Sequence, residues 1–125
     1  MLKNKIYTLE AVHASEPAAL TAEIRIIRGH PLFDGHFPGN PLLPGVCTVQ
    51  IIKELLEEAL QQPLRMTKAS NIKYLGFINP DHHPVLQFKM IIKHGETGMV
   101  GVNASVLFEG NVLCSFKGEF VPSPT

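Results

Sequence analysis

Residues 30–46 read His-Pro-Leu-Phe-Asp-Gly-His-Phe-Pro-Gly-Asn-Pro-Leu-Leu-Pro-Gly-Val, and this run is the most informative part of the sequence. Its four prolines and three glycines restrict much of the backbone, because each proline fixes φ. His36 stands between a glycine and a Phe-Pro pair, and the run ends directly before a helical pattern. The sequence therefore predicts an imidazole on a stiff loop, close to the N-terminus of a helix.

The helix is predicted to start at Pro44 and to end before Pro63. Proline suits a first helical turn, where its missing N–H costs nothing, and the residue before a proline avoids helical dihedrals. Apolar residues recur every three or four positions, at Val46, Val49, Ile52, Leu55, Leu56, Ala59 and Leu60. Gln50, Glu54, Glu57 and Gln61 fall on the opposite side. The unpaired N–H groups around Gly45 and Val46 are suited to holding a carbonyl oxygen or a developing oxyanion.

The remaining sequence predicts antiparallel β structure around this helix. Alternating apolar residues indicate strands at 5–13, 20–28, 65–76, 84–93, 99–108 and 111–120, with tight turns at 95–98 and 109–111. The order of elements is β-β-α-β-β-β-β, which predicts an α+β domain with one long central helix laid against a curved antiparallel sheet of about six strands. Residues 1–125 are expected to form a single domain, with residues 121–125 as a flexible tail.

Composition limits the classes of function. The formal net charge is zero, so nothing indicates a nucleic acid or an anionic membrane surface as partner. No stretch approaches the roughly 20 apolar residues that span a bilayer, and no targeting segment is visible. The two cysteines, Cys47 and Cys114, lie in different contexts and do not indicate a disulfide framework. Cys47 is expected to be a small buried residue. A cytoplasmic protein is the expectation.

The Gly-His-Phe-Pro segment, followed by Pro41-Leu-Leu-Pro-Gly-Val46, resembles the active-site loop of the hot-dog-fold 3-hydroxyacyl-[acyl carrier protein] dehydratases. The detailed match covers about residues 30–50. A weaker echo follows at Lys73-Tyr-Leu-Gly-Phe-Ile-Asn-Pro80, where the family has a Lys-Phe-Arg-Arg-Pro-Val-type strand. The resemblance implies a hot-dog fold and the conversion of 3-hydroxyacyl thioesters of acyl carrier protein to trans-2-enoyl thioesters, in fatty-acid or related polyene and lipid biosynthesis.

The resemblance also implies roles for individual residues. His36 matches the base that removes the α-proton, and the backbone amide of Gly45 matches the group that polarises the thioester carbonyl. Phe37, Gly45 and Val46 fall among the implied substrate-binding residues. The family's helix carboxylate, which handles the departing hydroxyl, matches Gln50. An amide has no proton that dissociates in the useful range, so Gln50 cannot act as a general acid, but it can hydrogen-bond a hydroxyl or a water.

Three interpretations of Gln50 remain open at this point. In the first, His36 carries out both proton transfers and Gln50 only orients the hydroxyl. In the second, the chain pairs with a different hot-dog chain that carries the carboxylate. In the third, the chain is a non-catalytic acyl-binding module. Glu54, one helical turn further on, and Asp34 are possible accessory carboxylates, whereas a solvated helix face is the simpler interpretation of Glu54 and of Glu57.

The resemblance further implies an assembly of subunits, and it makes one other activity less favoured. Two subunits of the family join their sheets edge to edge, and the histidine of one chain faces the helix residue of the other. We therefore expect a homodimer or a larger oligomer, with a heterodimer as the alternative. An acyl thioesterase is a less favoured activity, since hot-dog thioesterases usually lack this loop. No cofactor is expected, and no metal, because Pro80 and Pro84 bracket Asp81-His82-His83 as a loop.

Overall fold

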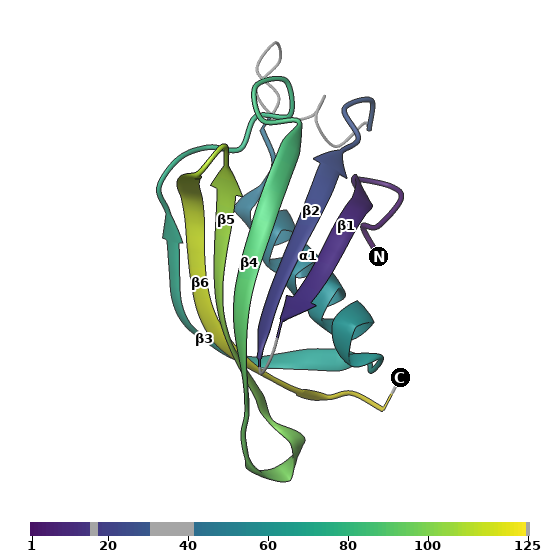
Figure 1. Ribbon diagram of the computed structural model, residues 1–125, viewed down its shortest axis with the longest axis vertical. Coiled ribbons are helices and arrows are strands. Elements are labelled where there is room, and N and C mark those ends of the chain that lie inside the picture. The colour runs from purple at the N-terminus through teal and green to yellow at the C-terminus, as the bar shows by residue number, and fades with distance from the viewer. Residues whose placement is uncertain (16–17, 31–41, 125) are drawn as a thin grey trace.

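One long helix lies against a curved antiparallel sheet (Figure 1). The computed structural model describes residues 1–15, 18–30 and 42–124. Within these ranges the helix is α1 (Gly45–Leu60), and a 3-10 turn, η2 (Glu96–Gly98), joins two of the strands. The strands are β1 (Tyr7–Ser15), β2 (Ala19–Ile26), β3 (Leu64–Tyr74), β4 (Val85–His94), β5 (Val100–Phe108) and β6 (Asn111–Pro122). The predicted α+β hot-dog architecture is confirmed.

The strands form one sheet in the order β1-β2-β4-β5-β6-β3. All neighbours are antiparallel, and short turns make hairpins of β4–β5 and β5–β6, as the glycine-containing turns predict. The chain reaches β3 directly after α1, and β3 then pairs with β6 at the far side of the sheet. The two edges of the described sheet are therefore β1 and β3 (Figure 1).

The core lies between α1 and the inner face of the sheet. The buried side chains of the central strands alternate as predicted, and they include Leu86, Phe88, Met90, Ile92, Val100, Val102, Ala104, Val106, Cys114, Phe116 and Phe120. The alternating pattern also places Phe108 and Val112 on the buried face. Phe108 is partly buried and packs against the core, but the expectation for Val112 is wrong. A register shift after Val106 places Leu107 opposite Val112, so Leu107 is buried and Val112 is exposed.

The buried face of α1 is rotated from the predicted face. Cys47, Thr48, Ile51, Ile52, Leu55 and Leu56 are buried, together with Glu54. Val46 is 74% exposed, so it does not belong to the core. The interpretation of Glu54 as part of a solvated face is wrong, because its side chain is only 2% exposed. In the described ranges, no helix combines the length and the apolar content needed to cross a membrane.

The C-terminal segment is more ordered than the sequence indicated. Val121 and Pro122 belong to β6, where they pair with Arg65 and Leu64. The backbone N–H of Ser123 also donates a hydrogen bond to the carbonyl oxygen of Pro63 over 2.9 Å. The expectation of a flexible tail from residue 121 is therefore wrong for these residues, because the first residues of β3 offer them a strand to pair with.

Candidate active site

The first N–H groups of α1 have no hydrogen-bond partner in the part of the chain that the structure describes. Pro44 precedes the helix, and its carbonyl oxygen accepts a hydrogen bond from Cys47 N–H over 2.9 Å. The N–H groups of Gly45 and Val46 form no hydrogen bond with any described residue. Helix geometry leaves these first N–H groups without an intrahelical partner. They are therefore available to an oxygen atom from outside the helix, as the sequence predicts.

Tyr74 lies directly over this helix terminus. A methyl group built on Gly45 would come within 2.6 Å of both Cζ and the hydroxyl oxygen of Tyr74. The tyrosine is the last residue of β3, and its side chain remains half exposed. Glycine at position 45 is thus what allows a phenol to sit on the first turn of the helix. Burial raises the pKa of the Tyr74 hydroxyl, so this group is a neutral donor near pH 7.

Gln50 lies in the wall of a cavity of about 240 Å³ between α1 and the neighbouring strands. The helix contributes three further side chains and the strands contribute three more, so that the lining residues are Val46, Val49, Gln50, Lys53, Arg65, Met66 and Phe120. The structure thereby brings two of the predicted site residues, Val46 and Gln50, to one hollow. Gly45, with its N–H group, occupies the first turn of the same helix.

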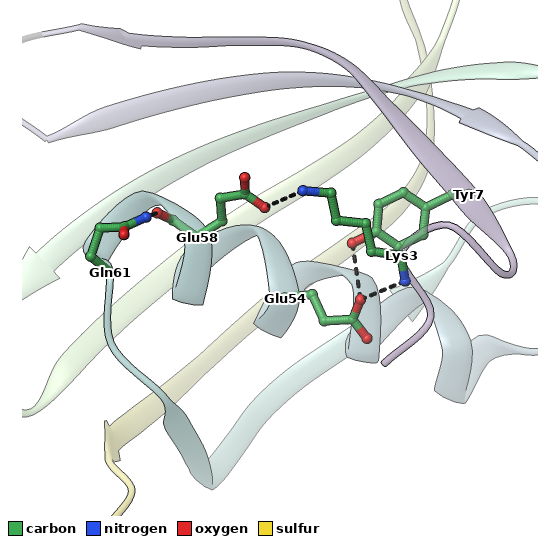
Figure 2. Close-up of polar contacts among 5 residues, drawn as sticks. All are labelled: Lys3, Tyr7, Glu54, Glu58 and Gln61. Carbon is green, nitrogen blue, oxygen red and sulfur yellow. Dashed lines mark hydrogen bonds and ion pairs between the residues drawn. The ribbon is translucent and has the colours of Figure 1, made fainter. Parts of the chain in front are cut away.

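Glu54 is buried one turn beyond Gln50, and each of its carboxylate oxygens accepts two hydrogen bonds. Oε1 accepts from the backbone N–H of Lys3 over 2.9 Å and from the hydroxyl of Tyr7 over 3.1 Å (Figure 2). Oε2 accepts from the backbone N–H of Leu2 over 2.8 Å and from Nε2 of Gln50 over 2.9 Å. The predicted accessory residue therefore contacts the predicted catalytic residue directly.

These contacts keep Glu54 ionised. Burial by itself would raise the pKa of the carboxyl group, because a low-dielectric environment disfavours the charged form. The hydrogen bonds from Leu2, Gln50, Lys3 and Tyr7 outweigh the burial and hold the pKa below its usual range. Since an ionised carboxylate has no proton to give, Glu54 is not a general acid in this arrangement.

The helix residue Glu57 has a structural contact. Its Oε2 accepts a hydrogen bond from the backbone N–H of Leu64 over 2.8 Å, at the start of β3. The exposed Glu58 carboxylate pairs with the Lys3 ammonium group over 2.8 Å (Figure 2). Along α1, therefore, Glu57 binds the following strand, while Glu54 and Glu58 bind the N-terminal segment.

The turn at residues 78–83 is tied to both flanks of the predicted catalytic loop. Before the loop, the guanidinium group of Arg28 pairs with Asp81 over 2.6 Å. After it, Leu43 N–H donates a hydrogen bond to the carbonyl oxygen of Ile78 over 2.8 Å. Within the turn, Asn79 N–H donates to Nδ1 of His83 over 3.0 Å. These contacts fit the predicted loop at Asp81-His82-His83, and no group of three metal-binding side chains converges anywhere in the described ranges.

Three of the predicted site residues lie outside the described residues. These are His36, Phe37 and Asp34, which belong to the interval between residues 30 and 42. Their roles therefore stay predictions. Cys47, by contrast, is described: it is buried, and burial raises the pKa of its thiol, which disfavours the thiolate needed for a nucleophile.

Sequence reasoning missed two tyrosines near this site. Tyr74 lies in the segment noted only as a weak echo of the family, and its place over Gly45 depends on the return of β3 past the helix. Tyr7 lies 47 positions from Glu54 along the chain and shows no motif. A buried glutamate on a helix needs donors, so the burial of Glu54 would have been the signal for a partner such as Tyr7, but the sequence placed Glu54 on a solvated face.

Comparisons with known proteins agree with the loop motif. The profile of a family named ApeI-like, described as ApeI dehydratase, matches residues 12–104. The 3-hydroxyacyl-[acyl-carrier-protein] dehydratase FabZ of Zymomonas mobilis is 37% identical over 87 residues, which are 70% of this chain and 51% of that protein. FabZ of Syntrophobacter fumaroxidans is 24% identical over 84 residues, 61% of this chain and 57% of that protein. The match thus spans little more than half the length of these relatives.

Solved structures share the fold at low sequence identity. The dehydratase heterocomplex ApeI:P from Xenorhabdus doucetiae superposes with a TM-score of 0.71 at 15% identity, covering 91% of this chain and 96% of that one. A hypothetical thioesterase protein with coenzyme A from Streptococcus pneumoniae gives a TM-score of 0.64 at 12% identity, covering 94% and 85%. The fold is common to both of these structures and does not by itself identify a family. The profile match covers most of the sequence, and it shows that the chain belongs to the ApeI-like dehydratase family.

Proposed function

We propose that this protein dehydrates 3-hydroxyacyl thioesters carried on acyl carrier protein and releases trans-2-enoyl thioesters. The observation that carries the proposal is the arrangement along α1. The unpaired N–H groups of Gly45 and Val46 lie in the first turn of this helix. Val46 and Gln50, one turn later, line one cavity. The loop that carries His36 enters this same helix in the sequence. Membership of a dehydratase family supports the reaction class.

In the proposed reaction, the N–H group of Gly45 donates a hydrogen bond to the thioester carbonyl oxygen. This contact stabilises the negative charge that develops there when the α-proton leaves. A ring nitrogen of His36 takes that proton, and the Cα–H electron pair forms the double bond to Cβ. The Cβ–O bond breaks, and the departing hydroxyl takes the proton back from the imidazolium group as water. Atoms and electrons balance without an oxidant or a cofactor.

Gln50 orients the hydroxyl in this scheme. It lines the cavity and has no dissociable proton, so His36 has to carry out both proton transfers. Val46 is proposed to form an apolar wall of the same site, since it lines the cavity and is exposed. Phe37 follows the base in the sequence and is proposed to contact the acyl chain.

The active form is proposed to be at least a dimer joined through β3. This strand pairs with β6 on one side, and its residues from Arg65 to Tyr74 are all exposed in the described sheet. Three of them, Met66, Ile72 and Tyr74, are large and apolar. An open strand edge with exposed apolar side chains favours pairing with another strand. Pairing there brings a second chain beside the cavity that contains Gln50, because Arg65 and Met66 line it.

The test is incubation of the purified full-length chain with a 3-hydroxyacyl thioester of acyl carrier protein. The expected product is the enoyl thioester, lighter by one water, as read by mass spectrometry. Release of a free thiol instead of the enoyl product would identify a thioesterase and contradict the proposal. A saturated acyl thioester is the matched control, since it lacks the hydroxyl to eliminate and is a substrate only for thioester hydrolysis.

A partner-dependent subunit is the second candidate, and the amide at position 50 favours it. If the chain alone gives no product, mixing with a hot-dog chain that carries a helix carboxylate tests this alternative. Turnover that appears only in the mixture assigns the carboxylate to the partner. Binding of acyl thioesters without turnover under either condition identifies a non-catalytic acyl-binding module.

A further inference from the structure

The buried carboxylate of Glu54 determines which end of the Gln50 amide is free. Nε2 of Gln50 lies 2.9 Å from Oε2 of Glu54. An ionised carboxylate only accepts hydrogen bonds, so the nitrogen of the amide has to face it. The reverse orientation would place the amide oxygen against a carboxylate oxygen. The groups that Gln50 retains for a ligand are therefore Oε1 and its second N–H.

The charge on Glu54 also changes the character of these remaining groups. A hydrogen bond to an anion is shorter and stronger than one between neutral groups, and hydrogen bonds in a chain polarise one another. Electron density that moves toward the amide oxygen makes Oε1 a better acceptor and the second N–H a poorer donor. A hydroxyl group of a ligand is the complementary partner, because its O–H can donate to Oε1.

We propose that Glu54 is the positioning residue that fixes the Gln50 amide so that its Oε1 accepts the hydrogen bond from the 3-hydroxyl group of the substrate. The proposal rests on the function proposed above. It adds a second role for the N-terminal segment, since the N–H group of Lys3 and the hydroxyl of Tyr7 hold the carboxylate in place (Figure 2). The N–H group of Leu2 binds the same carboxylate. The orientation of one amide at the cavity thus depends on residues about 50 positions earlier in the chain.

Glu54→Gln tests the proposal, with Glu58→Gln as the matched control. Glu54→Gln keeps the shape of the side chain but removes its charge and half of its acceptors. Glu58→Gln changes only the exposed pair with Lys3. Glu54→Asp is a third variant. It keeps the charge, shortens the side chain by one methylene and serves if Glu54→Gln does not fold.

The first measurement is the side-chain amide signal of Gln50 in protein labelled with ¹⁵N, assigned by its loss in Gln50→Ala. The ligands are a 3-hydroxyacyl pantetheine thioester and the same thioester without the hydroxyl. In the parent protein and in the Glu58→Gln control, only the hydroxylated ligand is expected to shift this signal. In Glu54→Gln and Glu54→Asp the difference between the ligands is expected to disappear. An equal response to both ligands in the parent, or a response retained in the Glu54 variants, overturns the proposal.

The second measurement is steady-state dehydration. Glu54→Gln is expected to lower kcat about tenfold or more while KM changes less than about threefold, since the thioester contacts remain. A merely structural role would instead reduce the folded fraction, which circular dichroism detects. If the parent protein gives no enoyl product, the proposed function fails, while the amide signal still decides whether Glu54 positions Gln50. Parent-like kcat in Glu54→Gln overturns the positioning role.

Discussion

Gln50 donates a hydrogen bond from Nε2 to Oε2 of Glu54 over 2.9 Å, between successive turns of α1. Gln50, which the resemblance matches to the family's carboxylate, is therefore in contact with the buried carboxylate of Glu54. Hydrogen bonds from four donors lower the pKa of Glu54 and keep it ionised. Its negative charge therefore acts on any side chain at position 50. An amide suits that position because its nitrogen can donate to the charge.

Replacing Gln50 with Glu is expected to give a group that keeps its proton at neutral pH. The charge on Glu54 disfavours a second charge at hydrogen-bond distance, so the pKa of the introduced carboxyl is raised. The protonated form can supply the leaving hydroxyl with a proton. Gln50→Glu is therefore expected to keep or raise the dehydration rate at acidic and neutral pH and to lose rate as the pH rises through the raised pKa.

A pH–rate profile checks this expectation, with the double variant Gln50→Glu, Glu54→Gln as control. Removing the neighbouring charge is expected to move the loss of rate to lower pH. The stability of Gln50→Glu is expected to change with pH in the same direction as its rate. A raised folded-state pKa stabilises the fold below the ordinary carboxyl pKa, and this effect is lost as the pH rises through the folded-state pKa. Identical profiles for the single and double variants would show that the two side chains do not interact.

Two glycines are expected to separate activity from stability. In Gly45→Ala the new methyl meets only the far end of the half-exposed Tyr74 ring, which can move aside. In Gly118→Ala the new methyl comes within 2.6 Å of the backbone oxygen of Lys68, and this backbone atom cannot move aside. We expect the free energy of unfolding of Gly45→Ala to stay within about 1 kcal/mol of the parent value. For Gly118→Ala we expect it to fall by about 1–3 kcal/mol.

Urea unfolding and dehydration assays of both variants test this contrast. Gly45→Ala is expected to lose activity at least severalfold, because Tyr74 is displaced from the helix terminus that is proposed to bind the thioester oxygen. Folded Gly118→Ala is expected to keep its activity, since this residue lies in β6, outside the cavity that contains Gln50. The opposite order of effects would place the thioester oxygen away from Gly45.

Local patterns predicted the fold well, and long-range contacts explain what they missed. Strand alternation identified the buried residues of β4, because a regular pairing keeps every second side chain on one face. It failed at Val112, where a register shift between Val106 and Leu107 changes the face. Helical periodicity likewise placed Glu54 on a solvated face, because the contacts that bury it come from distant parts of the chain. The donors that make its burial favourable are Leu2, Lys3 and Tyr7, which no spacing within the helix reveals.

Assembly through β3 predicts that a charge on this edge dissociates the oligomer. Ile72 is an exposed apolar residue of β3, and Val12 is one of β1, at the other edge of the described sheet. Ile72→Asp is expected to sediment as a monomer and to lose dehydration activity, whereas Val12→Asp is expected to behave as the parent. A dimer that survives Ile72→Asp but not Val12→Asp would move the interface to β1.

Removal of the proposed base is expected to abolish turnover without unfolding the protein. His36→Ala should lower kcat about 100-fold or more, the usual effect of losing a general base. His13→Ala is a matched control, because His13 is an exposed residue of β1 away from the helix terminus. Dehydration at the parent rate by purified, folded His36→Ala protein would assign the proton transfers to another group.

The lowered pKa of Glu54 makes a prediction about acid stability. A carboxyl group whose folded-state pKa lies below its unfolded value, about 4.3, stabilises the fold above that value and loses this effect as the pH falls through the folded pKa. Glu54→Gln removes charged hydrogen bonds at a buried position and is expected to lower the free energy of unfolding by about 1–3 kcal/mol at pH 7.

The difference in free energy of unfolding between Glu54→Gln and the parent should shrink as the pH falls below about 4, because protonation weakens the same hydrogen bonds in the parent. Urea unfolding at pH 7, 5 and 3 measures it, and the exposed Glu58→Gln variant should remain within about 0.5 kcal/mol throughout. A difference that stays constant down to pH 3 would mean that Glu54 does not hold its charge in the folded protein.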